Sequence, residues 1–413
     1  MKEKILFLYE HRVRELDPIV ITKIMIDNLY RENYVKIANI SFNRRISYVK
    51  YLPKILLVPF FHNRTDWEQY AYFFNECYDI NPTIVNLHWE QVGSENSQDF
   101  LIPKDETSKK IYHVSWSNNF SSILKKEGRI DDELIWQIGN PKADLLTSYF
   151  WRTYIEKDDL KRVINIPKSS TLYLFIMSFS SAFVSDEYIN SVEKKGGYKN
   201  FKRFVQLSRE SLELSILEIK KLAKYLSDKN GYILMRPHPL TPISEIKKRV
   251  KDNKNIKVSR QFPLHEVIFN SDGVISWLST GILDSYIYKK PSVILRPKEL
   301  PNEYDLDFLK GFQFAKDAKD IYDILLNEKN LFTNEKLLEE TVERMYGNLD
   351  GKNCLRLAEK IIELDKNVPN YTPTKRNKSL YYSTLLNAIV KDVPKNLLAK
   401  YFPKILPSDL EGR

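Results

Sequence analysis

The stretch PTIVNLHWEQ, from Pro82 to Gln91, decides how the sequence folds. An apolar, β-branched run of strand length passes directly into a histidine, an indole, a carboxylate and an amide. In open α/β sheets, ligands bind outside the carboxyl ends of the strands. The stretch therefore predicts a buried strand whose end carries a binding or catalytic site, although an ordinary loop would have the same sequence.

The same alternation of apolar runs with polar or helical segments extends along the whole chain. In the first half the strand-like runs are KILFLY (4–9), VKIANI (35–40), KILLVPF (54–60), IYHVSW (111–116) and LIWQIG (134–139). In the second half they are TLYLFIMSF (171–179), GYILMRPHP (231–239), GVIS (273–276) and SVILRP (292–297), with a long helix at 208–229. This alternation predicts the α/β class, with parallel sheets covered by helices.

The length of 413 residues exceeds one compact core and suits two domains. We expect two Rossmann-like domains facing one another across a cleft, one formed by residues 1–155 and the other by residues 156–345. Residues 346–413 would add C-terminal helices and a tail that cross back to the first domain or contact a membrane.

Composition and charge narrow the class of partner. Hydrophobic residues make up 43% of the chain, the two cysteines form no CxxC pair, and no apolar stretch is long enough to span a membrane. These features predict a globular protein of the cytoplasm. The net charge of +10 favours an anionic partner. Because zinc-finger, RNA-recognition and basic-zipper signatures are missing, we expect no nucleic acid.

The segment from Tyr371 to Arg413 holds eight Lys or Arg against three Asp or Glu, with aromatic and leucine residues between them. A basic, aromatic, amphipathic segment can lie on the inner face of the cytoplasmic membrane. A helix packed back on the protein, with a solvated basic face, explains the pattern equally well.

Two strand ends in the second half carry chemically useful groups. The strand GYILMRPHP ends in the turn Arg236–Pro239, which places a cation and an imidazole between two stiffening prolines. The strand GVIS runs into the segment Ser279–Gly281, where a helix is expected to start. Hydroxyls and free amide groups at a helix start can bind phosphate, although an ordinary N-cap uses the same residues.

In this order, the RPHP turn and the Ser-Thr helix start resemble the HP and S-S/T motifs of bacterial glycosyltransferases that use CMP-activated sugars. These are the sialyl-, polysialyl- and Kdo-transferases of capsule and lipopolysaccharide assembly. The resemblance implies the two-domain GT-B fold, with residues 1–155 on the acceptor side and residues 156–345 on the nucleotide-sugar side. It also implies contacts of His238, Ser279 and Thr280 with CMP. It extends more loosely to the phosphotransferases that polymerise CDP-glycerol, whose Asp and Lys-Pro pattern is matched by Asp284 and Lys290-Pro291.

Four pieces of the first half resemble, in the same order, proteins described as surface carbohydrate biosynthesis proteins. The pieces are HRVRELD, NLHWEQ, HVSWSNNFSSILKKEG and QIGNPKADLL. Together with the second-half pair, the resemblance implies an enzyme of surface glycan assembly.

Transfer from a nucleotide sugar needs a base for the acceptor hydroxyl and groups that stabilise the departing phosphate. We expect the base to be Glu90 or Glu15, with His88 beside them, and we interpret His62 and His113 as structural. The predicted substrate and nucleotide contacts are Arg14, Gln91, Asn140, Ser178, Arg236, His238, Pro239, Ser279, Thr280 and Gly281. Because phosphate is already a good leaving group, we expect no metal and no other cofactor.

The sequence therefore predicts a glycosyltransferase that moves a sugar from a nucleotide donor, preferably a CMP-linked ulosonic acid of the Kdo or sialic type. The acceptor would be a bacterial surface glycan or a lipid-linked glycan. The alternatives are a CDP-glycerol-type glycerophosphotransferase, a UDP-sugar-using GT-B transferase or epimerase, and a nucleotide-binding protein of degenerate GT-B fold without catalysis.

Overall fold

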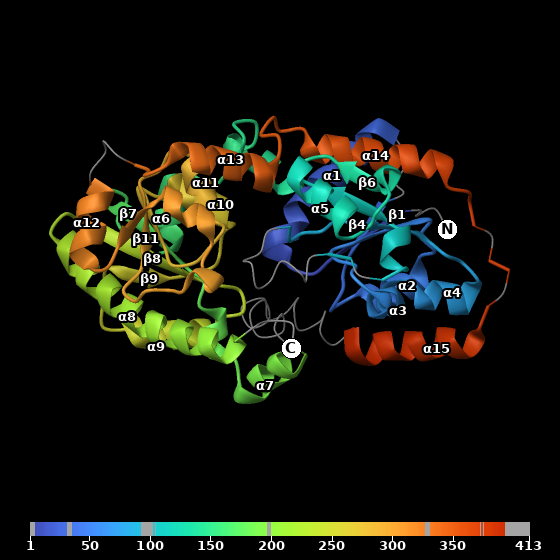
Figure 1. Cartoon of the computed structure of the whole chain (residues 1–413), viewed down its shortest axis with the longest axis horizontal. Coiled ribbons are helices and arrows are strands. Elements are labelled where there is room, and N and C mark those ends of the chain that lie inside the picture. The colour runs from blue at the N-terminus through green and yellow to red at the C-terminus, as the bar shows by residue number, and fades with distance from the viewer. Residues whose placement is uncertain are drawn as a thin grey trace. The chain divides into compact units, whose positions relative to one another are not determined.

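The computed structural model describes residues 5–30, 35–91, 102–103, 105–195, 200–326, 331–371, 373–374 and 376–392. These residues divide into two compact units (Figure 1). The N-terminal unit comprises the described residues up to Gln91, those from 102 to Tyr149, and those from Glu343 onward. The second unit comprises the described residues between Phe150 and Val342.

The N-terminal unit is built on a parallel six-stranded sheet in the order β2-β1-β3-β4-β5-β6. Its strands are β1 (Ile5–Tyr9), β2 (Val35–Asn39), β3 (Ile55–Val58), β4 (Thr83–Asn86), β5 (Tyr112–Ser115) and β6 (Ile135–Gln137). All six coincide with the apolar runs that the sequence predicts as strands. Because every pairing is parallel, all six carboxyl ends lie at one edge of the sheet.

Both faces of this sheet are buried, which explains why its strands are apolar throughout instead of alternating with polar residues. Phe7 and Leu57 point into the cluster that also holds residues of α14 (Asn353–Asn367), whereas Leu6 and Leu56 point into the cluster on the opposite face. All four side chains are at most 1% exposed. Full burial of one such side chain contributes about 1.5–3 kcal/mol.

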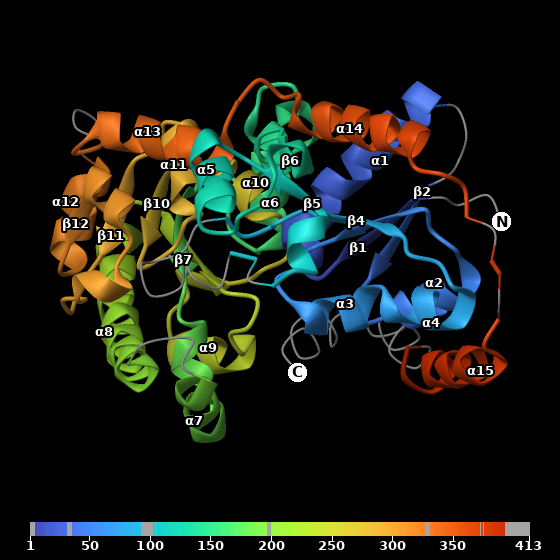
Figure 2. The same ribbon diagram turned by 45° about the vertical axis from the view of Figure 1, so that its right-hand side comes forward.

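Helices cover the two faces of the N-terminal sheet. They are η1 (Arg12–Leu16), α1 (Asp17–Tyr30), α2 (Arg44–Lys50), α3 (Arg64–Tyr70), α4 (Tyr72–Tyr78), η3 (Ser108–Lys110), α5 (Asn118–Lys126), η4 (Asp132–Leu134) and η5 (Pro141–Leu146). The C-terminal helices α14, α15 (Lys378–Asn387) and η10 (Ala388–Asp392) return to this unit. In both ribbon views α14 runs beside α1, and α15 runs beside α2 and α4 (Figures 1 and 2).

The second unit repeats the design with a parallel sheet in the order β12-β11-β10-β7-β8-β9. Its strands are β7 (Thr171–Met177), β8 (Gly231–Pro237), β9 (Ile256–Val258), β10 (Gly273–Ser276), β11 (Ser292–Leu295) and β12 (Gln313–Ala315). The long helix α8 (Phe201–Ser227) packs on one face of this sheet, where its Ile219 and Leu222 join Phe175 and Met235 in one buried cluster. The predicted fold class, two Rossmann-like α/β units with parallel sheets, is confirmed.

The remaining helices of the second unit connect its strands or cover its faces. They are η6 (Trp151–Thr153), α6 (Lys157–Val163), η7 (Ser180–Phe183), α7 (Asp186–Lys195), α9 (Ile243–Val250), α10 (Leu264–Asn270), α11 (Ile282–Ile287), η8 (Asn302–Tyr304), η9 (Asp307–Gly311) and α12 (Ala318–Leu326). Helix α13 (Glu335–Tyr346) contains the point where the chain passes to the N-terminal unit. Within the described ranges, every helix falls short of the length or the apolar character needed to cross a bilayer.

Candidate functional site

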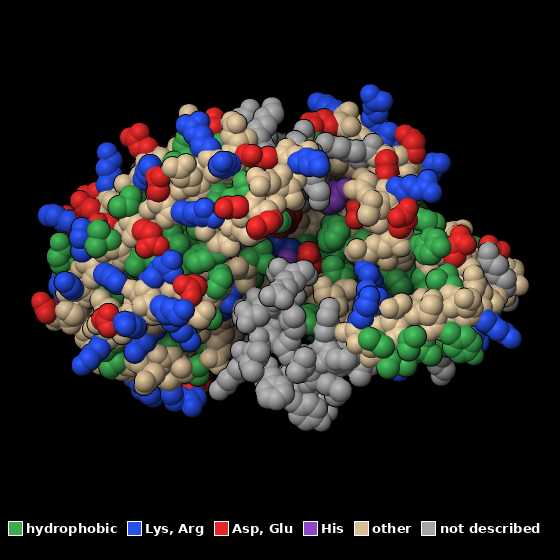
Figure 3. Space-filling view, turned by 90° about the horizontal axis from the view of Figure 1, so that it is seen from below, with side chains coloured by type: hydrophobic (Ala, Val, Ile, Leu, Met, Phe, Trp, Pro, Cys, Tyr) green, Lys and Arg blue, Asp and Glu red, His purple; other side chains and the backbone are tan. Residues whose placement is uncertain are grey.

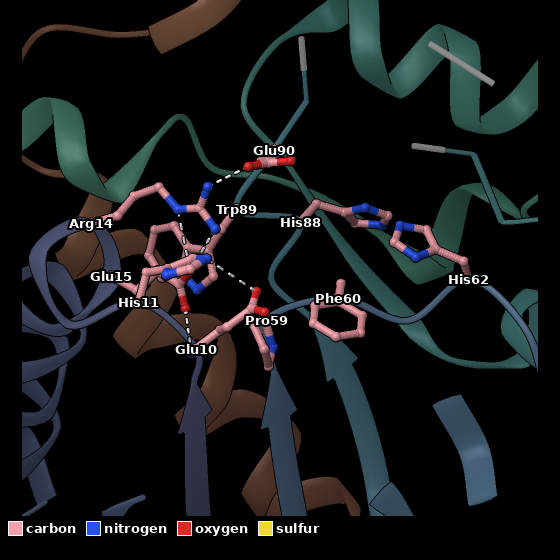
Figure 4. Close-up of a pocket in the computed structure, with 10 residues that line it drawn as sticks. All are labelled: Glu10, His11, Arg14, Glu15, Pro59, Phe60, His62, His88, Trp89 and Glu90. Carbon is pink, nitrogen blue, oxygen red and sulfur yellow. Dashed lines mark hydrogen bonds and ion pairs between the residues drawn. The ribbon is translucent and has the colours of Figure 1, made fainter. Parts of the chain in front are cut away.

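A cavity of about 300 Å³ opens at the carboxyl edge of the N-terminal sheet, where β1, β3 and β4 end side by side. Its lining comes from the three segments that follow these strands: Glu10, His11, Arg14 and Glu15; Pro59, Phe60 and His62; and His88, Trp89 and Glu90 (Figure 4). The strand-end reasoning from the sequence thus brings Arg14, Glu15, His88 and Glu90 together around one cavity.

Arg14 connects the two carboxylates that the sequence proposes as bases. Its Nη2 lies 2.9 Å from Oε1 of Glu15, and its Nη1 donates to Oε1 of Glu90 (Figure 4). Burial alone would lower the pKa of Arg14, but the carboxylates of Glu15 and Glu90 raise it. Arg14 is therefore a permanent cation in the cavity wall.

The two glutamates differ in access to solvent. Glu15 is fully buried, its Oε1 accepts from Arg14, and its Oε2 accepts from the backbone amide of Glu10 at 2.8 Å. Burial raises the pKa of Glu15, and the charge of Arg14 opposes that shift. The side chain of Glu90 is 61% exposed. This geometry indicates that Glu15 holds Arg14 in place, whereas Glu90 is accessible to a ligand.

His88 belongs to a hydrogen-bonded chain that leads from the cavity wall into the sheet. Its Nε2 lies 2.8 Å from Nδ1 of His113, and Nε2 of His113 lies 2.8 Å from the carbonyl oxygen of Ser108. A carbonyl can only accept, so His113 donates from Nε2 and accepts at Nδ1, and His88 donates from Nε2. Nδ1 of His88 is thus an unprotonated acceptor that is buried and has no hydrogen-bond partner among the described residues.

Burial keeps both imidazoles neutral at pH 7. It lowers the pKa of His88 well below its ordinary value, with His113 and His62 adding to the shift, and it lowers the pKa of His113 to about 4. His88 also has a backbone φ of +47°, a left-handed conformation that is unfavourable for a residue with a Cβ. Strained backbone of this kind concentrates at functional sites.

Two predicted contact residues of the first half are occupied by backbone groups instead of facing the cavity. Gln91 donates to the carbonyl of Val114 and accepts from the amide of Trp116, both at 2.9 Å. Asn140 caps η5 by accepting from the amide of Lys142 at 3.0 Å. Neither residue is among those that line the cavity.

In the second unit, the predicted nucleotide contacts gather at the carboxyl edge of three neighbouring strands. The register pairs Met177 with Pro237, and Ile176 with Ser276. Ser178 and His238 therefore follow adjacent strands, and β10 ends on the other side of β7. Because neighbouring strands lie about 4.8 Å apart, His238 and the segment after Ser276 are separated by about 10 Å at their base.

Arg236 and His238 differ in what holds them. Arg236 is 8% exposed, and no described carboxylate pairs with it; burial, followed by the charge of Arg260, lowers its pKa to about 10. Nδ1 of His238 accepts from the amide of Leu240 at 3.2 Å, so the neutral ring carries its proton on Nε2. Arg260 donates to the carbonyls of His238 and Pro239 and fixes the turn.

The expected phosphate cradle after β10 differs in detail from the prediction. Helix α11 begins at Ile282, with Gly281 as its N-cap, and spans only six residues. The amide of Gly281 donates to the hydroxyl of Ser279 at 3.2 Å, so it is already satisfied, whereas Thr280 is exposed. The hydroxyl groups, more than the helix start, remain as candidate ligand contacts.

One residue that sequence reasoning missed is Arg296, which follows the end of β11. Its Nη2 lies 2.8 Å from Oδ1 of Asp305, and its guanidinium lies 5.8 Å from the ring of Trp277, which stacks on Phe179 at 4.3 Å. Nε and Nη1 of Arg296 are buried and have no described partner. A repeated signal was present in the sequence, because Arg-Pro ends both SVILRP and YILMRP.

Comparison with solved structures shows where this fold occurs. The chain is similar to the wall teichoic acid polymerase TagF in its H548A form, with 15% identity, a TM-score of 0.62, and 90% of this chain and 91% of that chain covered. The TagF H444N variant soaked with CDPG gives 13% identity and a TM-score of 0.59, with 90% of each chain covered. At these identities the similarity supports the two-domain GT-B architecture. None of the curated proteins matches the sequence significantly.

The family comparison is more specific. Residues 87–363, about two thirds of the chain, match the family described as CDP-glycerol:poly(glycerophosphate) glycerophosphotransferase. The match starts at Leu87, beside His88, and extends through the whole second unit. It favours the CDP-glycerol alternative over transfer from a CMP-linked ulosonic acid. The chain is a transferase that belongs to the CDP-glycerol:poly(glycerophosphate) glycerophosphotransferase family.

Proposed function

We propose that this protein transfers a phosphorylated alcohol, of the glycerol phosphate type, from a CDP-linked donor to a hydroxyl group of a surface glycan or polymer. The acceptor oxygen attacks the β-phosphorus of the donor. The bond from that phosphorus to the oxygen of CMP breaks, and CMP leaves with the bonding electrons.

The buried guanidinium of Arg236, without a described carboxylate partner, carries this proposal. An unpaired buried cation is costly unless an anion arrives to pair with it. Arg296 adds a second cation, with two buried nitrogens that have no described partner, at the same edge of the same sheet. A diphosphate has two charged groups to be held, so this set of cations suits CDP better than CMP.

The N-terminal cavity supplies candidates for the proton acceptor. Nδ1 of His88 is a buried atom of a residue that lines the cavity, its lone pair has no described partner, and a general base of this type contributes about 10²–10⁴-fold to rate. Glu90 is the other candidate because its carboxylate is exposed. Arg14 beside it would attract an anionic acceptor such as a poly(glycerol phosphate) chain.

CMP release from CDP-glycerol, measured with a short synthetic poly(glycerol phosphate) acceptor, tests the proposal. We expect release in the wild type that depends on the acceptor, a loss of about 100-fold or more in His88→Ala, and unchanged binding of CDP-glycerol in that variant. Acceptor-dependent release from CMP-sialic acid or CMP-Kdo, with none from CDP-glycerol, would contradict it.

Transfer of a CMP-linked ulosonic acid is the second candidate, and the RPHP turn with the Ser-Thr pair favours it. In that reaction the acceptor oxygen attacks the anomeric carbon, and the product gains no phosphorus. The two candidates share the leaving group CMP, so analysis of the product, not of the nucleotide, separates them.

Contact with a membrane surface is also part of the proposal, and α15 supports it. Leu380 and Tyr381 pack on the N-terminal unit, whereas Tyr382, Leu386, Ile389 and Val390 are between 51% and 62% exposed. Hydrophobic side chains are visible on the right-hand half of the molecule in the view from below (Figure 3). The segment formed by α15 and η10 is thus apolar on its covered face and on its open face.

Charge favours anionic lipid as the cover for this open face. Residues 376–391 hold three Lys or Arg and no Asp or Glu, and α2, on which α15 packs, adds Arg44, Arg45 and Lys50 without an acidic residue. A second copy docked on the same face would bring like charges together. The part of the predicted basic tail after residue 392 lies outside the described residues.

Sedimentation with lipid vesicles tests this contact. We expect binding to vesicles containing phosphatidylglycerol, weakening with added salt, and loss of binding when Leu386 and Val390 are both replaced by Ser. The matched control replaces Ser383, an exposed polar residue of α15, by Ala. Dimerisation without vesicle binding would contradict the proposal.

A further inference from the structure

The surroundings of the buried pair His88 and His113 determine which nitrogen of each ring carries the proton. His113 on β5 is paired with Asn86 on the neighbouring strand β4, and His88 lies two residues after Asn86. The pairing of the two strands therefore brings the rings together, with centroids 5.1 Å apart and Nε2 to Nδ1 at 2.8 Å. Both residues are at most 1% exposed.

The carbonyl of Ser108 determines which groups donate and which accept along the hydrogen bonds of the two histidines. It can only accept, so the proton of neutral His113 lies on Nε2, and Nδ1 must accept the proton of Nε2 of His88. Reversing either tautomer would place two protons face to face or leave the buried carbonyl without its donor. The only lone pair that remains on the two rings is that of Nδ1 of His88, a buried atom without a described partner on a residue that lines the cavity.

The carbonyl itself is held rigidly by the turn that precedes β5. Oδ1 of Asp105 accepts from the amides of Thr107 and Ser108 at 3.0 and 2.9 Å, and the hydroxyl of Ser108 donates to the carbonyl of Asp105 at 2.8 Å. The orientation of Ser108 is therefore fixed independently of the two histidines.

We propose that His113 is a positioning residue, which fixes His88 in the tautomer whose Nδ1 takes the proton of the acceptor hydroxyl. In the step, the proton moves from the hydroxyl to Nδ1 of His88 while the hydroxyl oxygen bonds to the β-phosphorus and CMP leaves with its electron pair. His88 becomes an imidazolium whose Nε2–H donates to neutral His113. This role rests on the proposed function, which supplies the hydroxyl and the phosphorus.

Two substitutions at one position separate this role from simple packing. In His113→Asn the side-chain oxygen takes the place of Nδ1 and keeps an acceptor for His88. In His113→Gln the amide reaches the place of Nε2 and keeps the contact with Ser108 but offers no acceptor at Nδ1. We expect kcat to stay within about 5-fold of wild type in the Asn variant and to fall about 100-fold in the Gln variant, with equal KM for CDP-glycerol.

Histidine tautomers read by ¹⁵N NMR on the full-length wild-type protein provide a test that needs no turnover. We expect His88 to be protonated on Nε2 alone, and the Nδ1 protonated form to appear in the Gln variant only. A wild-type His88 protonated on Nδ1, or equal loss of kcat in both variants when their thermal stabilities match, would overturn the inference. If His88 has the predicted tautomer but no CMP is released from CDP-glycerol, the proposed function would be contradicted while the tautomer assignment would remain valid.

Discussion

The guanidinium of Arg14 pairs with the carboxylate of Glu90, 76 positions further along the chain, while also binding the fully buried Glu15. The sheet makes this possible, because the segments after β1 and β4 meet at one edge on either side of β3. Arg14 thus has one structural partner and one partner exposed to solvent.

Replacing Arg14 by Ala should destabilise the fold by about 1–3 kcal/mol, because it leaves the buried carboxylate of Glu15 without its charged donor. Replacing Glu90 by Gln should change stability by less than about 0.5 kcal/mol, since that side chain is exposed. Urea unfolding of the two variants measures the difference. Equal destabilisation by both would contradict the different roles given to the two glutamates.

Replacing Arg236 by Met should separate stability from binding. The variant removes a buried guanidinium without a described ion-pair partner, so we expect unchanged or increased stability, by about 1 kcal/mol. We also expect binding of CDP-glycerol, measured by calorimetry, to weaken at least about 10-fold.

Arg296→Met is the matched control for that substitution, because it breaks an existing pair with Asp305. It should therefore lower both stability and donor affinity. A large loss of stability in Arg236→Met, with donor affinity kept, would show that Arg236 serves the fold.

Stability should fall with acid because of the buried histidines. The pKa of His113 is about 4 in the folded chain, below its value of about 6.5 when unfolded, so the unfolded state binds more protons between these two pH values. The contribution is complete above pH 6.5 and is lost as the pH falls towards 4, with a slope of at most about 1.4 kcal/mol per pH unit. His88 adds in the same direction, while the raised pKa of Glu15 acts oppositely at the acidic end.

Urea unfolding at pH 7.5 and pH 5.5 checks this dependence, with His113→Asn as the comparison because Asn does not titrate. We expect the loss of stability between the two pH values to be smaller in the variant. An identical loss in both proteins would mean that His113 is not buried in neutral form.

The Gly-Asn-Pro turn should prove structural. Oδ1 and Oδ2 of Asp144 accept from the amides of Asn353 and Cys354 at 2.9 and 2.7 Å and cap α14. Asp144→Ala should therefore cost about 1–2 kcal/mol. At a temperature where the variant is fully folded, its KM for the donor should be unchanged. A raised KM with full stability would return this turn to the binding site.

The sequence was a good guide to the sheets because both faces of each sheet are buried. Runs such as KILLVPF therefore stay apolar throughout, and each of these runs contains a strand. Helices are harder to predict where the segment has no long apolar stripe. The polar segment after Ser178, for which the sequence indicates no helix, contains η7 and α7.

Only those residues of the candidate site that directly follow a strand could be predicted from the sequence. Parallel strands share one carboxyl edge, so Arg14, Glu15, His88 and Glu90 were expected together and line one cavity. The pairing of His88 with His113 was not visible, because it depends on the register between β4 and β5. Gln91 and Asn140 look like ligand contacts in sequence, but backbone groups of the segment around Val114 and Trp116 bind both ends of the Gln91 amide, and the side-chain oxygen of Asn140 caps its own turn.

Phosphorus NMR of the reaction product tests the central claim most directly. With CDP-glycerol and a synthetic poly(glycerol phosphate) acceptor, the wild type should form one new phosphodiester for each CMP released, and His88→Ala should form neither above background. A product that gains a sugar from a CMP-linked donor without gaining phosphorus, while CDP-glycerol is left intact, would contradict the account.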